Sequence, residues 1–424
     1  MSQLKEKDKK YIWHPFNQMK GADIIPMIKG EGAYVFDEEG NRYIDAFSSW
    51  WVNIHGHSHH YLSKALYEQA QKLDHVAFGG FTNEKAVVLS EQLIELLPDK
   101  FTKLFFSDNG STSTEVALKM TMQYHHNRSD EKQLFIALEN GYHGDTFGSM
   151  CVTARGGFNE PFEKHMFDVG YISAPTKENI KEVLSQVESL LQKGNVAGFI
   201  FEPLVQGAGG MLMHDADALS QVIALCQKHG VICIADEVMT AYGRTGKFFA
   251  CEYLSVQPDI MCISKGITGG FMAIGITAVS QHIYDAFYSD DAKHTFLHGH
   301  SYTGNALACA LGVANLELFQ LEQTMDQVAR ISNTLQSFIP SLESNNGVRA
   351  VRHLGAILAI ELETEGASSY FNTKGKEAYQ YFLKKGIILR PLGNVLVLIP
   401  PYCISDEDLK YIHNEILLYL AIEN

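Results

Sequence analysis

The stretch VICIADE at residues 231–237 and the stretch DIMCISKGITGG at residues 259–270 share one pattern, an apolar run that ends in charged residues. Uninterrupted apolar runs of this length are typical of strands that are buried on both faces of a parallel sheet. Asp236 and Glu237 follow the first run, and Lys265 follows the second. Because ligands bind at the carboxyl ends of strands in open parallel sheets, these charged residues are candidates for a functional site.

The same alternation of apolar runs and helical patterns extends through the middle of the chain. Strand candidates are Lys103–Ser107, Gln133–Leu138, Val196–Phe201, Val231–Ala235 and Asp259–Ser264, and helix candidates are Ser111–His126, Lys181–Gln192 and Leu219–His229. Strands that alternate with helices predict an α/β fold with a mostly parallel central sheet covered on both faces.

The two ends of the chain differ from this middle part. We predict that residues 1–60 form an N-terminal segment that contributes to a small domain and to the active site, that residues 61–325 form the large cofactor-binding domain, and that residues 326–424 form the C-terminal small α+β domain. The C-terminal pattern comprises Leu321–Phe338 and Asp406–Ala421, which predict helices, and Ala356–Leu362 and Val395–Ile399, which predict strands.

The composition argues against several classes of protein. The 424 residues carry a net charge of −15 and show no long basic stretch, which a nucleic-acid-binding protein is expected to have. The seven cysteines form no CxxC pair, as is typical of reduced cysteines inside cytoplasmic proteins. Because neither a signal-peptide pattern nor an apolar run of about 20 residues is present, we expect a soluble cytoplasmic protein without a membrane partner.

A second candidate feature follows the strand predicted at Lys103–Ser107. There the sequence DNGSTSTE at residues 108–115 opens a predicted helix with small residues, including Gly110 and Ser111. The exposed N–H groups and the dipole of such a helix start favour an anion such as phosphate. Ordinary helix capping by serine and threonine would explain the same residues.

Lys265, Asp236 and this helix start together match the requirements of one cofactor. Pyridoxal phosphate needs a lysine for covalent attachment, an acid beside its ring nitrogen and a site for its phosphate. A desolvated lysine beside flexible glycines is also a good nucleophile. Tyr142, which follows the strand predicted at residues 133–138, is a candidate to stack on the cofactor ring. The residues therefore predict a pyridoxal phosphate enzyme.

With these residues identified, the chain resembles the class III pyridoxal phosphate-dependent aminotransferases across nearly its whole length. The stretches that carry the resemblance are Trp13–Pro15, Ser48–His57, Gly141–Gly148, Glu202–Gly210, Ile234–Gly246, Asp259–Gly270 and Thr303–Ala310. The resemblance implies the fold type I architecture and a homodimer whose active sites lie at the subunit interface.

The resemblance also implies roles for individual residues. Lys265 is expected to bind the cofactor covalently, Asp236 to contact its ring nitrogen and Tyr142 to cover its ring, and these are the expected catalytic residues. Further cofactor contacts are expected from Gly110, Ser111, His300 and Ser301, with Ser301 reaching the phosphate from the other subunit. The expected substrate contacts are Phe16, Trp50, Tyr142, Lys265, Gly299 and Arg390.

Arg390 makes physical sense in this role, because a guanidinium can hold a substrate carboxylate with two hydrogen bonds. Two other positions depart from the family pattern, which has tyrosine at the position of Phe16 and proline at the position of His300. Phe16 removes a hydroxyl near the substrate, whereas His300 offers a backbone N–H that proline lacks.

Several of the stretches are most similar to the branch of the family that converts 8-amino-7-oxononanoate to 7,8-diaminononanoate in biotin biosynthesis. S-adenosylmethionine is the expected amino donor, and lysine is the alternative donor. Another class III omega-aminotransferase and a pyridoxal phosphate-dependent aminomutase are further alternatives. His55, His57, His59 and His60 cluster without the spacing of a metal-binding helix, so no metal site is predicted.

Overall fold

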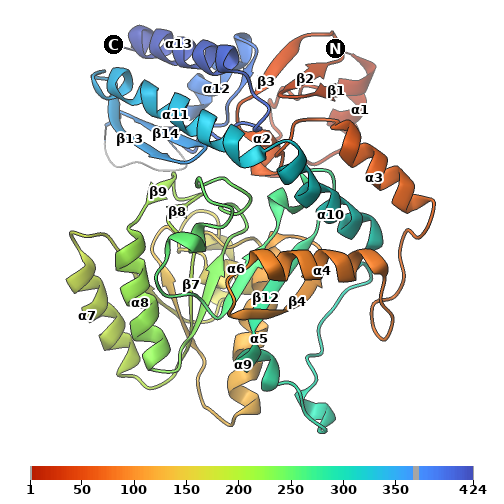
Figure 1. Ribbon diagram of the computed structural model, residues 1–424. Helices are drawn as coiled ribbons and strands as arrows, with labels where there is room; N and C mark the ends of the chain where they lie inside the picture. Colours follow the sequence, from red (N-terminus) through yellow and green to blue (C-terminus); the bar gives the residue numbers. More distant parts are fainter. Residues whose placement is uncertain (1, 366–371, 424) are drawn as a thin grey trace.

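A seven-stranded sheet lies at the centre of the computed structural model, which describes residues 2–365 and 372–423 (Figure 1). The strands lie in the order β4 (Phe101–Ser107), β12 (Gly275–Ser280), β11 (Ile260–Ile263), β10 (Ile232–Asp236), β7 (Val196–Phe201), β5 (Leu134–Leu138) and β6 (Val169–Ile172). Strand β12 pairs antiparallel with both of its neighbours, and the other pairs are parallel. The predicted α/β class with a mostly parallel sheet is therefore confirmed.

Both faces of this sheet are buried, which explains the uninterrupted apolar runs. Successive strand residues point to opposite faces, so Ile232 and Ile234 of β10 belong to one apolar cluster and Cys233 and Ala235 to another. The helices that cover the two faces are α5 (Gly110–Asn127) on the first, and α4 (Glu84–Leu96), α7 (Ile180–Leu191) and α8 (Ala216–Lys228) on the second.

The remaining helices connect the strands or belong to the upper part of Figure 1. The α-helices are α1 (Gln3–Tyr11), α2 (Ser48–Trp51), α3 (His60–Ala70), α6 (Phe147–Val152), α9 (Gln281–Asp285), α10 (Ala306–Leu321), α11 (Thr324–Glu343), α12 (Lys374–Lys384) and α13 (Asp406–Glu423). The 3₁₀ turns are η1 (Glu160–His165), η2 (Ala250–Tyr253), η3 (Lys265–Thr268) and η4 (Ala292–His294).

Smaller sheets form the upper part of the molecule, where both termini also lie (Figure 1). One sheet contains β13 (Val348–Leu354), β14 (Ile357–Leu362) and β16 (Val395–Leu398), and another contains β1 (Met27–Glu31), β2 (Tyr34–Asp37), β3 (Arg42–Asp45) and β15 (Ile387–Ile388). A short hairpin pairs β8 (Val205–Gln206) with β9 (Leu212–Met213). Because β15 pairs with β3, the first 60 residues and the C-terminal region share a sheet.

The structure shifts the start of one predicted helix and contains further elements that were not predicted. The helix predicted over Leu321–Phe338 begins three residues later, because α10 ends at Leu321 and Gln323 has a φ of 48°. A left-handed residue cannot continue a right-handed helix, so α11 begins at Thr324. Within the central sheet, strands β6 and β12 were not predicted from the sequence.

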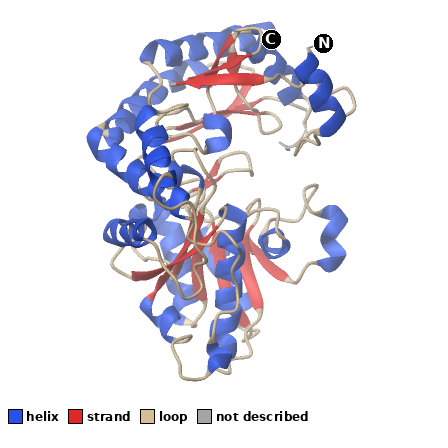
Figure 2. Cartoon of the chain, turned by 90° about the vertical axis from the view of Figure 1, so that its right-hand side faces the viewer, coloured by secondary structure: helices blue, strands red, loops and turns tan. Residues whose placement is uncertain are grey.

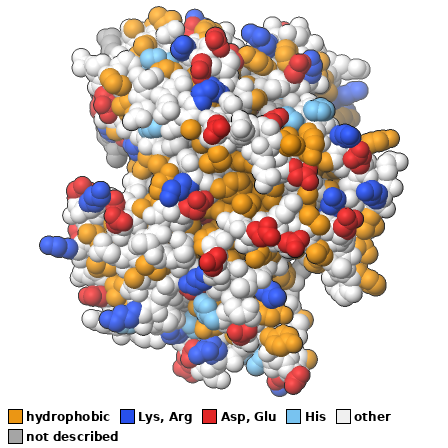
Figure 3. Space-filling view, viewed as in Figure 1, with side chains coloured by type: hydrophobic (Ala, Val, Ile, Leu, Met, Phe, Trp, Pro, Cys, Tyr) orange, Lys and Arg blue, Asp and Glu red, His pale blue; other side chains and the backbone are white. Residues whose placement is uncertain are grey.

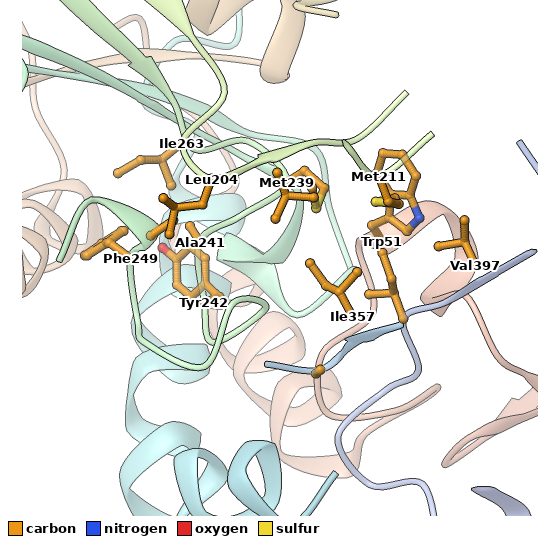
Figure 4. Close-up of a cluster of buried hydrophobic side chains, with 14 of the residues drawn as sticks. Trp51, Leu204, Met211, Met239, Ala241, Tyr242, Phe249, Ile263, Ile357 and Val397 are labelled. Atoms are coloured by element: carbon orange, nitrogen blue, oxygen red, sulfur yellow. The ribbon is translucent and has the colours of Figure 1, made fainter. Parts of the chain in front are cut away.

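Apolar packing joins the two parts of the molecule, which Figure 2 shows one above the other. In Figure 4, Ile263 of β11, Ile357 of β14 and Val397 of β16 lie in one cluster with Trp51 and Met239. On the surface, apolar side chains gather across the middle of the face seen in Figure 3, where the two parts meet. Among the described residues, no helix combines the length and the apolar character that crossing a membrane requires.

Candidate active site

A cavity of about 660 Å³ lies at the carboxyl ends of the central strands. Its walls come from the segments that directly follow the strands, together with Trp51 and Val52 from the N-terminal region. The predicted site residues that line it are Gly110 and Ser111 after β4, Tyr142 after β5, Asp236 at the end of β10 and Lys265 after β11. The sheet therefore brings together, at the ends of its strands, residues that are up to 155 positions apart in the sequence, from 110 to 265.

Lys265 begins the turn η3 with a left-handed φ of 44°, a conformation that is uncommon for lysine. Its Nζ lies 4.4 Å from the ring centroid of Trp51, a cation–π contact inside the cavity. Burial lowers the pKa of the ammonium from 10.5 to about 8, against the opposing charges of Asp236 and Glu202. Lys265 is therefore much closer to a free amine at neutral pH than a surface lysine is.

Asp236 is held by two hydrogen bonds at the floor of the cavity. Nδ1 of His143 donates to its Oδ2 at 2.7 Å, and the backbone N–H of Val238 donates to its Oδ1 at 3.1 Å. Both side chains of the Asp236–His143 pair are buried, with exposed fractions of 5% and 3%. His143 fixes the orientation of a carboxylate that would otherwise be an uncompensated buried charge.

The start of α5 forms a cradle with no room for side chains at two positions. A Cβ on Gly110 would lie 2.5 Å from Cγ1 of Val238, and a Cβ on Gly144 would lie 2.3 Å from Oγ of Ser111. Ser111 Oγ lies 3.0 Å from Thr146 Oγ1 and also accepts from the backbone N–H of Thr146 at 3.0 Å. The first N–H groups of a helix have no acceptors within the helix, so this start offers them to an anion in the cavity.

Helix capping accounts for a different residue of the same segment. The Asn109 side chain accepts from the N–H of Thr112 at 2.9 Å, and the Thr112 hydroxyl accepts from the N–H of Asn109. Capping and anion binding are therefore compatible, because Asn109 caps the helix and Gly110 and Ser111 face the cavity.

Tyr142 and Glu202 form another part of the wall. The backbone N–H of Tyr142 donates to Glu202 at 3.1 Å, and that of Gly207 donates to the same carboxylate at 2.8 Å. The Tyr142 hydroxyl donates to Asp145 at 2.9 Å. Burial raises the pKa of Glu202 to about 7.

The tryptophans that border the cavity lie on a left-handed turn. Residues Ser48, Ser49, Trp50 and Trp51 have φ values of 53°, 46°, 73° and 71°. Asp45 holds the turn by accepting from the N–H of Ser49 at 3.0 Å and from its hydroxyl at 2.8 Å. Strained backbone of this kind concentrates at functional sites, and here it orients Trp50 and Trp51 differently.

Trp51 lines the cavity beneath Lys265, whereas Trp50 packs against other predicted substrate residues. The Arg390 guanidinium lies 4.1 Å from the Trp50 ring centroid, and the Phe16 ring lies 5.3 Å from it. Phe16, Trp50 and Arg390 are thus one cluster next to the cavity, although none of the three is among its lining residues.

The segment Gly299–Ser301 is not part of the lining of this chain's own cavity. Gly299 and Ser301 are exposed, and the nearest acidic contact of His300 is Asp108, 4.0 Å away. Nε2 of His75 donates to the backbone oxygen of Ser301 at 2.5 Å. Within one chain, these predicted cofactor and substrate residues therefore do not join Lys265 in the lining of the cavity.

The residues of the cavity fit pyridoxal phosphate. Lys265 offers the amine, Asp236 a buried carboxylate for the ring nitrogen, and the Gly110–Ser111 cradle a site for the phosphate. For the histidine cluster, no group of three or more histidine, cysteine or acidic residues in residues 2–365 and 372–423 is arranged to hold a metal ion. His55 instead contacts Asn315, and His59 contacts Glu322.

Sequence reasoning missed His143, Glu202 and Trp51 as residues of the site. His143 and Glu202 each follow a buried apolar run, as Asp236 and Lys265 do, so the strand-end rule could have found them. Trp51 has no such signal, because its place in the cavity depends on the left-handed turn.

Comparison with known proteins agrees with this geometry. Residues 17–420 match the family model described as Aminotransferase class-III. The chain is 43% identical over 415 residues to the adenosylmethionine-8-amino-7-oxononanoate aminotransferase of Synechococcus elongatus. This match covers 95% of this chain and 96% of the relative.

Solved structures of aminotransferases are also similar to this chain. A crystal structure of adenosylmethionine-8-amino-7-oxononanoate aminotransferase from Methanocaldococcus jannaschii has a TM-score of 0.94 and 34% identity, and the match covers 99% of this chain and 98% of that one. An amine transaminase from an uncultivated Pseudomonas species in its PLP-bound form has a TM-score of 0.90 and 26% identity, with 96% and 97% covered.

Proposed function

The chain belongs to the class III aminotransferases, and on that premise we propose that it transfers an amino group to 8-amino-7-oxononanoate, forming 7,8-diaminononanoate in biotin biosynthesis. S-adenosylmethionine is the proposed donor. The observation that carries the proposal is the meeting of Lys265, the Asp236–His143 pair and the Gly110–Ser111 cradle in one cavity, in a chain whose relatives are named for this reaction.

The chain has the fold type I architecture and uses pyridoxal phosphate as its cofactor. When bound, the cofactor acts as an electron sink for the substrate carbon that loses or gains the amino group. Asp236 would favour a protonated ring nitrogen, and His143 fixes the orientation of the Asp236 carboxylate. Ser111 and the first N–H groups of α5 hold the phosphate.

Lys265 carries out the proton transfers of the proposed reaction. Its lowered pKa leaves a larger fraction of the side chain as free amine near neutral pH than a surface lysine has, so that Nζ can take a proton from the donor's reacting carbon. The same Nζ returns a proton to the acceptor's C7 in the second half of the reaction. Tyr142 and Trp51 bound the space in which these transfers occur and exclude water from it.

The far end of the acceptor carries a carboxylate, for which Arg390 is the proposed partner. The Arg390 guanidinium already lies against the Trp50 ring, so the two side chains form a preorganised surface next to the cavity. Phe16 extends this surface with an apolar ring. The aliphatic chain of the acceptor would lie along Trp50 and Phe16 towards Arg390.

We further propose a cytoplasmic homodimer in which each subunit completes the other's site. Trp13, Leu297 and Tyr302 have exposed fractions of 88%, 83% and 66%, which is unusual for large apolar residues. A partner subunit that covers these residues would also place its own Gly299, His300 and Ser301 near this chain's phosphate cradle.

Lysine is the second candidate donor, because Phe16 supplies no hydroxyl to a polar donor at this surface. The experiment that separates the donors is a single-turnover titration of the pyridoxal phosphate-loaded protein without acceptor. Loss of the visible cofactor band with S-adenosylmethionine alone supports the proposal, and loss with lysine alone replaces the donor. If neither compound removes the band, the proposed reaction is wrong.

A further inference from the structure

Of the described residues that line the cavity, Asp145, Glu202 and Asp236 carry carboxylates. Asp236 is paired with His143, and Asp145 is exposed and accepts from the Tyr142 hydroxyl. Glu202 is different, because its side-chain hydrogen bonds within the described chain come from the backbone N–H groups of Tyr142 and Gly207. It is a carboxylate in the cavity wall without a cationic partner among these bonds.

Glu202 is also close to the reacting end of the cavity. A Cβ on Gly207 would lie 3.5 Å from Oε1 of Glu202 and 3.2 Å from the Trp51 ring. Lys265 Nζ lies 4.4 Å from the centroid of that same ring. Lys265 thus lies over the Trp51 ring, and Glu202 is near the same ring on the side of Gly207.

Because Glu202 is buried, an unpaired negative charge on its carboxylate would cost free energy. The side chain is 6% exposed, and burial raises its pKa to about 7. A buried carboxylate of this kind is stabilised when a cation comes to lie beside it. The site is therefore suited to a ligand that brings a positive charge into the cavity.

The proposed acceptor brings such a charge. In 8-amino-7-oxononanoate the amine is on the carbon next to the reacting carbonyl, so it enters the cavity together with C7. An ammonium group there would be buried without a counter-charge unless a carboxylate met it. Asp236 is committed to the cofactor ring, and Asp145 lies at the exposed side.

We propose that Glu202 binds the ammonium group on the carbon adjacent to the reacting carbonyl and thereby selects a vicinal amino ketone as acceptor. This inference rests on the proposed function, since that function supplies the amine. Glu202 has no role in the proton transfers, which belong to Lys265. It acts on binding and orientation of the acceptor through a charged hydrogen bond.

The test compares two acceptors on the pyridoxal phosphate enzyme preloaded with an amino group from the donor. One acceptor is 8-amino-7-oxononanoate, and the other is 7-oxononanoate, which lacks the amine. The wild-type protein is expected to show a kcat/KM at least about tenfold higher for the amine-bearing acceptor, as a hydrogen bond to a charged group provides. In Glu202→Gln that ratio is expected to fall towards one.

Two further variants separate this role from a structural one. Glu237→Gln is the matched control, because Glu237 is also a buried carboxylate held by backbone N–H groups, those of Ala250 and Cys251, but it does not line the cavity. Glu237→Gln is expected to change kcat/KM for the two acceptors by the same factor. Asp145→Asn should likewise leave the ratio unchanged, and a loss of the ratio in that variant would assign the ammonium to Asp145 and overturn the proposal.

The failures of the two proposals give different results. A wild-type protein that aminates both acceptors with equal kcat/KM overturns the role of Glu202 without any variant and leaves the proposed function standing. If the ratio of kcat/KM for the two acceptors is the same in Glu202→Gln as in the wild-type protein, the role of Glu202 is likewise overturned and the proposed function stands. A wild-type protein that takes the donor's amino group but aminates neither acceptor overturns the proposed function and this inference with it.

Discussion

Lys265 shows how position sets the chemistry of a single side chain. The residue follows a buried strand, its Nζ lies over an indole ring, and the charges of Asp236 and Glu202 act on it. Burial favours the neutral amine, while the two carboxylates favour the ammonium, and burial is the larger effect. The result is a lysine with a pKa of about 8, which is suited to nucleophilic attack near neutral pH.

This pKa predicts the pH dependence of cofactor capture. Only the free amine attacks, so the rate at which cofactor-free protein takes up pyridoxal phosphate should rise with pH and level off above about 8. The measurement is the growth of the visible band after mixing, at a series of pH values. A rate that continues to rise towards pH 10.5 would show that Lys265 titrates like a solvent-exposed lysine. Lys265→Ala, which should form no band, is the control.

His143 predicts a difference between two substitutions. In His143→Leu the Asp236 carboxylate loses its 2.7 Å donor, and a lost hydrogen bond to a charged group costs about 1.5–3 kcal/mol, or about 10- to 100-fold in cofactor affinity. His143→Asn keeps an N–H donor near the position of Nδ1, so it should lose less. The measurement is an absorbance titration of the cofactor-free variants. Equal affinities for the leucine variant and the wild-type protein would contradict the role of His143.

The element that most affects the shape of the site is the turn at α2. Left-handed backbone costs roughly 1–2 kcal/mol for each residue other than glycine, and this turn has four such residues in succession. The cost is offset by the bonds to Asp45 and by the Ser48 hydroxyl, which donates to the Ile399 carbonyl at 2.6 Å. His57 donates to the second Asp45 oxygen at 2.9 Å and fixes the carboxylate in turn.

Asp45→Asn should therefore weaken substrate binding as well as stability. Asparagine leaves the Ser49 hydroxyl and His57 without their shared acceptor, at an expected cost of about 1–3 kcal/mol in the free energy of unfolding. The tryptophans lose their fixed orientation, so KM for the acceptor should rise more than kcat falls.

Asp37→Asn is the matched control for this prediction. Asp37 is a buried aspartate that organises the turn between β2 and β3 through Asn41 and Tyr43, away from the cavity. Urea unfolding should show destabilisation of both variants, whereas steady-state kinetics should show a raised KM for Asp45→Asn alone. Equal KM values in the two variants would mean that the turn does not position the tryptophans.

The elements differ in how far the sequence could predict them. Strands such as β7 and β10 are continuous apolar runs, and burial on both faces leaves no other reason for that pattern. The turn at Ser48–Trp51 and the break at Gln323 could not be predicted, because serine, tryptophan and glutamine have no preference for left-handed backbone. The bonds to Asp45 and Ile399 that stabilise the turn form only in the folded chain.

The same distinction applies to the site residues. Lys265 and Asp236 could be predicted because both follow adjacent parallel strands. The pairing of His143 with Asp236 joins residues 93 positions apart and depends on the strand order of the sheet, which a single sequence does not reveal. The predicted roles of Gly299, His300 and Ser301 stay predictions, because they concern a second subunit.

At the scale of the whole molecule, the site combines the strand ends of the large sheet with Trp51 and Val52 from the N-terminal region, so both parts of the chain must be correctly placed for activity. The exposed apolar residues Trp13, Leu297 and Tyr302 are compatible with the proposed homodimer. A second copy would complete the phosphate site and cover the apolar surface.

Shared sites predict complementation between inactive variants. Lys265→Ala removes the amine, and Ser301→Asp places a negative charge where the proposed phosphate contact lies. When the two chains are co-expressed, a mixed dimer has one site with an intact Lys265 and the partner's intact Ser301. Activity should therefore return to about half of the wild-type value for each mixed dimer. No recovery in mixed dimers isolated with two affinity tags would contradict sites that are shared between subunits.

The central claim, amino transfer to 8-amino-7-oxononanoate, is tested most directly by following the nitrogen atom. The purified, pyridoxal phosphate-loaded protein is incubated with 8-amino-7-oxononanoate and S-adenosylmethionine that carries ¹⁵N in its amino group, and the products are analysed by mass spectrometry. The account predicts 7,8-diaminononanoate that carries one ¹⁵N, and none of this product when the donor is omitted or in Lys265→Ala. Conversion of the acceptor without a donor, or its complete recovery unchanged with both S-adenosylmethionine and lysine present, would contradict the account.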